Sequence, residues 1–142
     1  EPPFGGPPEP RASPAFGDEC DGNRGPEALA TLTDGRLFVA CEGRDSAATV
    51  VWMGQGQRWT SRPYLLEPKM AGMGDVYRPT GAARLPGGDL LLLERSFPPL
   101  RVRLTRLARD ELEGTGPLHP LEVARLNPPL TLDNFEGIDA AL

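Results

Sequence analysis

The chain has 142 residues and a net charge of −5, because its 20 acidic side chains outnumber its 15 basic ones. This charge argues against nucleic-acid binding, which requires a basic domain or patch. No apolar run reaches the length of about 18 residues that suggests a membrane-spanning helix, so no membrane span is expected. The hydrophobic fraction of 39% leaves enough apolar side chains for the core of an ordinary domain.

Residues 1–21 are rich in proline and glycine and predict an extended or flexible lead-in. After the lead-in, short apolar runs and turn residues follow one another, as is typical of a β protein. The first four strands are expected at residues 27–32, 36–41, 49–53 and 58–66. Thr33-Asp34-Gly35, between the first two strands, is a strong hairpin signal.

Residues 67–79 predict a connecting loop, and four further strands are expected at residues 80–85, 89–94, 101–107 and 118–126. In the third of these, apolar and basic residues alternate as in a strand. The leucine spacing from Leu100 to Leu112 also fits a helix. A short helical turn at residues 108–112 therefore stays open as an alternative.

The chain repeats itself. Residues 27–41 align on residues 80–94 without a gap, and a third copy opens at residues 135–140. A repeat of about 40–50 residues with four short strands indicates a β-propeller. We therefore expect an all-β fold, a partial β-propeller with blades at residues 27–66 and 80–126 and the start of a next blade at residues 132–142. So few blades cannot close a ring, which makes the remaining blades of a larger protein the expected partners.

Cys20 and Cys41 are the two cysteines of the chain. They form no C-x-x-C motif and lie far in sequence from His119, so a zinc site is not expected. They either form one disulfide in an oxidising compartment or remain buried thiols that pack as small apolar side chains. The position of Cys41 inside a predicted strand favours the thiols.

Glu27 and Glu136 open the first and third repeats, and Asp133 precedes the third. Because the first strand of a propeller blade lines the central channel, these carboxylates are candidates to gather around one axis. Clustered carboxylates bind a hard cation such as calcium, or share protons. Alternatively, each Glu caps a blade edge by accepting backbone N–H bonds. The second repeat has Thr80 at this position, which weakens a strict ring of ligands.

Few other residues are candidates for a catalytic or binding role. No G-x-S-x-G nucleophile motif occurs, and His119 lies in a strand-entry context that favours a structural role. Five arginines between Arg95 and Arg109 predict either a phosphate-binding row or the solvated face of an outer strand. Glu94 and Arg95 predict an internal ion pair or a substrate contact near the channel. Trp52 and Trp59 are expected to pack across the hairpin between them.

Four stretches together carry a family resemblance: Asn23–Ala30, Thr33–Leu37, Gly81–Arg95 and Leu132–Ile138. They resemble the bacterial phytase-like family, often described as having esterase-like activity of phytase. The most specific pieces are Asp133-Asn-Phe-Glu-Gly137 and Leu93-Glu-Arg95. The resemblance implies a secreted or periplasmic propeller of roughly six blades, related at a distance to calcium-dependent phosphate-ester hydrolases.

The resulting hypothesis is a metal-assisted hydrolase that acts on a small anionic phosphate ester or another ester. Glu27, Asp133 and Glu136 would hold the calcium ion, which polarises the ester oxygen or activates water. Arg24 and Arg95 would orient the anionic group of the substrate. The competing hypothesis is a non-catalytic propeller for binding or scaffolding, in which any calcium is purely structural.

Overall fold

Eight strands form two antiparallel four-stranded sheets in the part of the chain that the computed structural model describes. That part comprises residues 12–20, 25–43, 48–65, 76–133, 135 and 137–141. The first sheet contains β1 (Pro26–Thr31), β2 (Leu37–Cys41), β3 (Ala48–Gln55) and β4 (Arg58–Leu65). The second contains β5 (Arg78–Arg84), β6 (Leu90–Ser96), β7 (Arg101–Leu107) and β8 (Leu121–Leu126). The short helices η1 (Gly17–Cys20) and α1 (Arg109–Glu113) complete the described elements.

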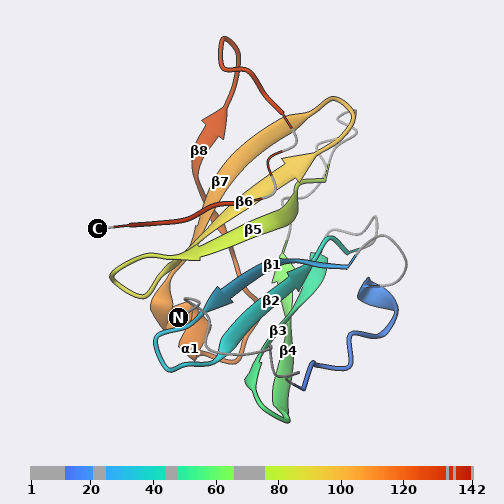
Figure 1. Ribbon diagram of the computed structural model, residues 1–142, viewed down its shortest axis with the longest axis vertical. Helices are drawn as coiled ribbons and strands as arrows, with labels where there is room; N and C mark the ends of the chain where they lie inside the picture. Colours follow the sequence, from blue (N-terminus) through green and yellow to red (C-terminus); the bar gives the residue numbers. More distant parts are fainter. Residues whose placement is uncertain are drawn as a thin grey trace, which may run out of the picture.

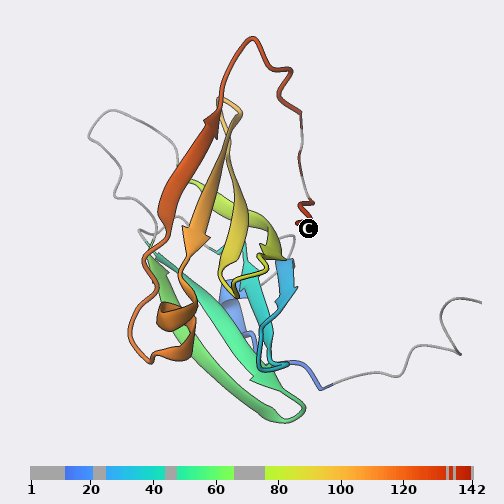
Figure 2. The ribbon, with the colours of Figure 1, turned by 90° about the vertical axis from the view of Figure 1, so that its left-hand side faces the viewer.

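The two sheets are the blades of a partial β-propeller, as the repeat predicted. Each sheet is a simple meander in which neighbours in sequence are hydrogen-bonded, and the two sheets remain separate. Figures 1 and 2 show the first blade (β1–β4) and the second blade (β5–β8) packed against each other, with β1 beside β5. No helix among the described residues is long and apolar enough to cross a membrane.

The repeat is visible in the turn that joins the first two strands of each blade. In the first blade Leu32 N donates to Arg36 O at 2.7 Å, and in the second Leu85 N donates to Asp89 O at 2.8 Å. Gly35 and its counterpart Gly88 adopt φ angles of 83° and 96°, a region that favours glycine. The two turns therefore have the same backbone conformation, and local sequence alone specifies it.

The repeat also extends to a bulge in each inner strand. The pairing register shifts between Pro26 and Ala28 in β1, and between Pro79 and Gly81 in β5. The residue at each shift is the one that opens the repeat, Glu27 in the first blade and Thr80 in the second. A bulge changes the direction of the side chain of its extra residue. The repeat therefore includes a bulge at its opening residue in both blades.

The core lies between the two blades. The inner strands contribute small side chains there, such as Ala28 and Ala30 of β1, which lets the blades approach closely near the axis. Larger side chains fill the space further out, where the blades diverge. The buried cluster consists of Ala28, Ala30, Leu32, Phe38, Ala40, Val51, Met53 and Tyr64 from the first blade, and Leu90, Leu92, Leu107, Leu112 and Leu118 from the second blade or the segment that joins its last two strands.

The described end of the lead-in covers the opposite face of the first blade. Phe16 meets Trp52 edge to face, with ring centroids 5.1 Å apart. A disulfide joins Cys20 of η1 to Cys41 at the end of β2, with 5.6 Å between their Cα atoms. The disulfide alternative therefore holds and the free-thiol one does not. Trp52 and Trp59 are not directly opposite each other in the hairpin, since Trp52 pairs with Ser61 and Trp59 with Gly54, but the register places both on the same face of the sheet.

The connection between β7 and β8 reaches back to the first blade. It contains the helical turn that the leucine spacing suggested, now seen as α1. Arg62 of β4 is 6% exposed and donates to Gly116 O at 2.6 Å and to Leu112 O at 3.3 Å. Leu118 forms a parallel bridge with Tyr64. This connection therefore ties the outer edges of the two blades together.

The third repeat packs along β5. Thr80 is fully buried, and its Oγ1 donates to the carbonyl oxygen of Phe135 at 3.2 Å. A Cβ placed on Gly81 would lie 3.3 Å from Ile138. Figure 1 shows this last segment passing beside β5. The described part of the third repeat thus contacts β5 at Thr80 and Gly81.

Candidate functional site

Two of the five site residues predicted from the sequence, Arg24 and Glu136, lie outside the described residues. Glu27 and Asp133 are both exposed. Within the described ranges, no three His, Cys, Asp or Glu side chains are grouped so that they could hold a metal ion. The calcium site therefore stays a prediction. Arg95 does lie at a pocket.

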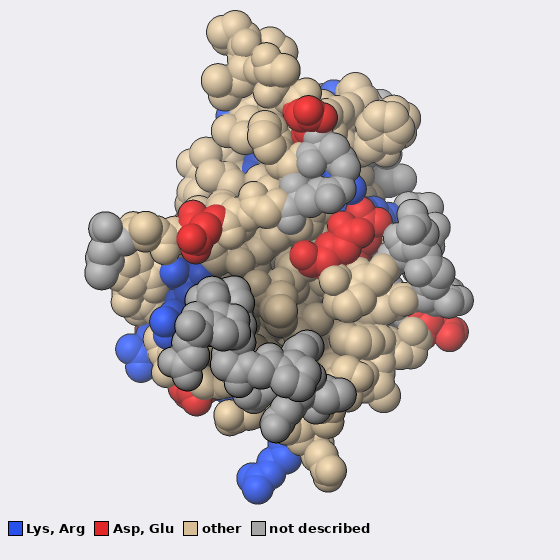
Figure 3. Space-filling model, viewed as in Figure 1, with Lys and Arg blue, Asp and Glu red and all other residues tan. Residues whose placement is uncertain are grey.

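The arginines from Arg95 to Arg109 do not form one row. Arg103 is 1% exposed and points into the second blade, where its Nε donates to Glu94 Oε2 at 2.6 Å. Arg106 and Arg109, by contrast, are exposed and bind Asp89 and Glu113. The expected phosphate-binding row is therefore divided between interior and surface. Figure 3 shows acidic and basic side chains in several small groups on the face seen there, some of them next to each other.

Glu94 lies at the centre of a buried polar network with Tyr64, Arg103 and Thr105. Its partner is Arg103, rather than Arg95 as the sequence suggested. Glu94 Oε1 also accepts hydrogen bonds from Tyr64 of the first blade and from Thr105 Oγ1, the latter at 3.0 Å. A buried charge is tolerated only when it is paired and hydrogen-bonded, and Glu94 meets this condition. The network holds the two blades in register.

Tyr64 and Tyr77 extend this network. Burial of the Tyr64 phenol, reinforced by the nearby Glu94 carboxylate, raises the pKa of Tyr64 well above its ordinary value. Arg103 also lies over the Tyr77 ring, 4.3 Å from its centroid. These contacts lie in the interior of the second blade, and none of Tyr64, Tyr77, Glu94 and Arg103 lines the blade-junction pocket described below. We therefore assign the network a structural role.

A pocket of about 360 Å³ lies where the two blades meet. We call it the blade-junction pocket. Its volume is in the range of small-molecule sites, about 300–1,000 Å³. It is lined by Glu42, Val76, Arg78, Arg95, Ser96, Phe97 and Leu100. The lining comes from the end of β2, the start of β5 and the end of β6, so the meander brings together three strand ends from two blades.

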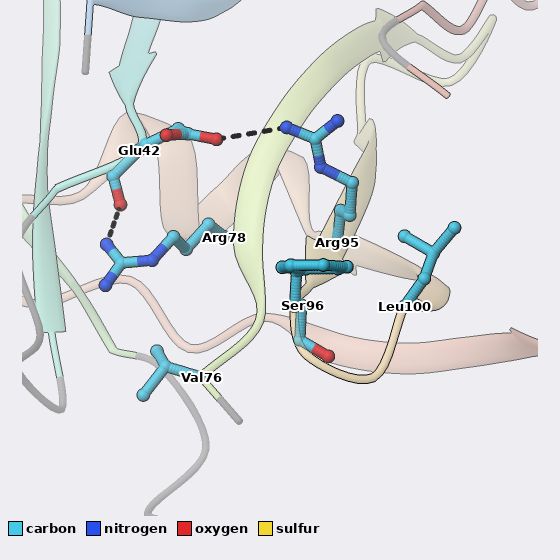
Figure 4. A pocket seen from close by; sticks show the side chains of 7 residues that line it. Glu42, Val76, Arg78, Arg95, Ser96 and Leu100 are labelled. Carbon is cyan, nitrogen blue, oxygen red and sulfur yellow. Dashed lines mark hydrogen bonds and ion pairs between the residues drawn. The ribbon is translucent and has the colours of Figure 1, made fainter. Parts of the chain in front are cut away.

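The charged side chains of this pocket contact one another across the blade boundary (Figure 4). Arg95 Nη2 donates to Glu42 Oε1 at 3.2 Å. Arg78 Nη1 donates to the carbonyl oxygens of Glu42 and Gly43, the latter at 2.6 Å. Glu42 and Arg95 are 53 positions apart, so they occupy the same place in successive repeats. Two guanidinium groups and one carboxylate therefore lie at one strand-end junction.

Ser96 adds a polar group at the wall of the pocket. Its residue is 2% exposed, yet its Oγ has no hydrogen-bond partner among the described residues. A buried hydroxyl without a partner is uncommon and calls for a physical explanation. Ser96 lines the blade-junction pocket, but its hydroxyl oxygen is buried and is directed away from Glu42 and Arg95 in Figure 4.

A larger hollow of about 650 Å³ lies at the turn between β3 and β4. It is lined by Arg36 and by the hairpin residues Gln55, Gly56, Gln57 and Arg58, of which the four hairpin residues are exposed. No buried polar group converges on it. By volume alone this hollow would be the better candidate for a ligand site. The charged side chains that converge on the blade-junction pocket favour that pocket instead.

Most of the pocket was missed from the sequence. Arg78 falls inside the predicted loop 67–79, and Glu42 lies one residue beyond the aligned part of the repeat. Only Arg95 was a candidate. His119, the other residue considered, is exposed and contacts Glu111 through its ring Nδ1 at 3.0 Å. It is not part of the pocket lining.

The fold and this site define a segment of a β-propeller with a cationic pocket at the junction of its first two described blades. The family model described as "Phytase-like: Esterase-like activity of phytase" matches residues 3–141. The chain therefore belongs to the phytase-like family. Comparisons with curated proteins and with solved structures found no match.

Proposed function

We propose that the chain carries an esterase-like hydrolytic site for a small anionic ester, located in the blade-junction pocket. One observation carries the proposal: Arg78, Arg95 and Glu42 converge on one pocket of substrate size. The family description, esterase-like activity of phytase, supports the same reaction class. Arg78 and Arg95 take the role of binding and orienting the anionic group.

Glu42 is the carboxylate of the pocket and takes the role of general base. It accepts a proton from water as the water oxygen bonds to the acyl carbon or phosphorus of the ester. The ester bond to the alcohol oxygen then breaks, and the proton on Glu42 passes to that leaving oxygen. The products are an acid and an alcohol. Arg95 donates a hydrogen bond to the oxygen on which negative charge develops.

A divalent cation remains a separate part of the proposal. Calcium bound by Glu27, Asp133 and Glu136 would polarise the ester oxygen or activate water. The described residues do not supply three ligands, so no step above depends on it. Calorimetric titration of the protein with calcium tests this part, with Glu27→Gln and Asp133→Asn expected to weaken binding. Unchanged affinity in both variants would contradict the ligand assignment.

We also propose that the protein is secreted or periplasmic. The disulfide between Cys20 and Cys41 supports this location, because structural disulfides persist in oxidising compartments. An assay of signal-dependent export of the full-length protein tests it. Recovery of the protein only from the cytoplasm would contradict the proposal.

The hydrolytic role is tested by release of 4-nitrophenol from mono-4-nitrophenyl succinate, an ester with one carboxylate. Glu42→Gln is expected to lower kcat by roughly 100-fold or more, the usual contribution of a general base. Arg95→Met is expected to lower kcat/KM by a similar factor. Arg106→Met is the matched control, because Arg106 is exposed and binds Asp89 away from the pocket.

The second candidate function is a non-catalytic binding or scaffolding propeller. One observation favours it. Thr80 occupies the repeat-opening position, and its hydroxyl donates a hydrogen bond to a backbone carbonyl oxygen of the next repeat. Repeat-opening side chains thus have a structural use. Binding of the ester to the protein with no release of 4-nitrophenol above the spontaneous rate would favour this function over hydrolysis.

A further inference from the structure

The two blades differ at their outer edges. β4 forms the outer edge of the first blade, and the segment around Leu118 covers part of it. Leu118 N donates to Pro63 O at 2.8 Å, and Leu65 N donates to Leu118 O at 2.9 Å. Pro63 itself lies within β4. A covering segment and a proline are two ways in which proteins protect a sheet edge from pairing with another strand.

The outer edge of the second blade lacks both of these protections. It is formed by β8, and among the described residues no strand pairs with its far side (Figure 1). Its sequence, Leu-Glu-Val-Ala-Arg-Leu, contains neither proline nor glycine. Leu121 and Val123 are large apolar side chains, yet the two residues are 66% and 48% exposed. An edge strand of this kind is a template for pairing with another chain.

The order of residues in β8 is complementary to itself. If two antiparallel copies pair about a two-fold axis at the centre of the strand, Glu122 of one copy lies opposite Arg125 of the other. Leu121 lies opposite Leu126 in the same register. Both copies then contribute the same residues, as a two-fold symmetric interface requires. Opposite charges that face each other stabilise an antiparallel pair of strands, whereas like charges destabilise it.

A bulge in β8 makes this charge pairing possible. Residues three apart in a regular strand point to opposite faces of the sheet. The pairing of β8 with β7 shifts between Leu104 and Thr105, which leaves Val123 as the extra residue. Glu122 and Arg125 therefore share a face, and Arg125 Nη2 donates to Glu122 Oε2 at 2.6 Å. Two paired copies would place acidic and basic side chains alternately along that face.

We propose that two copies of the protein associate through β8, so that the second blades of both copies form one continuous sheet. The outer strand of a blade lies on the perimeter of a propeller, where further blades leave its edge accessible. One strand of six residues on each side is smaller than a standard interface, and the bulge interrupts the regular hydrogen bonding. We therefore expect a weak dimer, with a dissociation constant of roughly 10–100 µM.

Sedimentation velocity of the full-length protein, over concentrations that span this dissociation constant, tests the association. Val123→Lys places two like charges next to the two-fold axis and is expected to weaken the dimer by roughly tenfold or more. Arg125→Glu places a carboxylate opposite Glu122 and is expected to weaken it by roughly tenfold. Arg125→Lys keeps the charge and is expected to associate like the parent protein.

Arg58→Glu is the matched control, because Arg58 is exposed on β4, the outer strand of the first blade. It is expected to leave the association unchanged. Circular dichroism checks that each variant is folded. A protein that stays monomeric over the whole concentration series would overturn the proposal. A dimer that neither Val123→Lys nor Arg125→Glu weakens would overturn it as well.

Hydrogen exchange locates the contact. Backbone amides of residues 121–126 are expected to exchange more slowly at high protein concentration, because β8 gains a hydrogen-bonded partner. Residues 58–65 of β4 should exchange equally at both concentrations. Protection that appears elsewhere, without a change in β8, would contradict the proposal. The result does not depend on the hydrolytic role, since no residue of β8 lines the blade-junction pocket.

Discussion

Arg103 and Glu94 form a buried ion pair in the interior of the second blade. Both side chains are almost fully buried, and the pair is supported by Thr105 and by Tyr64 of the first blade. The two residues face each other because β6 and β7 pair in a register that places Glu94 opposite Arg103. A change of one residue in this register would leave both charges buried and unpaired.

The first prediction concerns this pair. Glu94→Gln leaves the Arg103 guanidinium buried without its carboxylate and is expected to reduce the free energy of unfolding by about 3–5 kcal/mol. Glu122→Gln is the matched control. Glu122 also binds Arg103, but its side chain is 28% exposed, so a loss of about 0–1 kcal/mol is expected. Urea denaturation measures both, and equal losses would contradict the role given to Glu94.

The second prediction concerns pH. The pKa of Tyr64 is raised in the folded protein by burial and by Glu94, whereas the unfolded chain releases this proton near about pH 10. Above that pH the folded state holds the extra proton, so stability is expected to fall as pH rises further. Tyr64→Phe has no such proton to lose and should show a flatter decline between about pH 9 and 11. Parallel declines in urea denaturation of the two proteins would contradict the shift.

At the scale of elements, the disulfide fixes the lead-in on the outer face of the first blade. It joins η1 to the end of β2, and Phe16 then covers Trp52. Trp52 is 5% exposed as a result. The face of the blade directed away from the core is therefore covered at this point by the chain itself.

The third prediction follows from this arrangement. Cys20→Ser is expected to reduce the free energy of unfolding by about 2–4 kcal/mol and to shift the fluorescence of Trp52 to longer wavelength as Phe16 detaches. Trp59 is the other tryptophan of the chain, so Trp59→Phe provides the background in which Trp52 reports alone. An emission spectrum that does not change on loss of the disulfide would show that packing alone holds the lead-in.

Strands and turns could be predicted from the sequence because their signals are local. The Asp34-Gly35 turn and its counterpart at Gly87-Gly88 specify hairpins by backbone conformation. The contacts between strands could not be predicted, since the pairing of Glu94 with Arg103 depends on register. The same limit hid Arg78, whose contacts with Glu42 and Gly43 are made across the blade boundary.

At the scale of the molecule, the repeat determines where the site forms. Each blade places the end of its second strand and the start of its first strand at the same end of the sheet. Packing β5 beside β1 therefore brings Arg78 and Arg95 of one blade next to Glu42 of the other. The blade-junction pocket is a product of two blades, and neither blade forms it alone.

The most direct test of the account is a map of where an anionic ester binds. Amide chemical shifts of the protein would be followed during titration with methyl 4-nitrophenyl phosphate. The largest shifts are expected at Glu42, Arg78 and Ser96, which line the blade-junction pocket. Shifts concentrated at residues 55–58, beside the larger hollow at the β3–β4 turn, would contradict it.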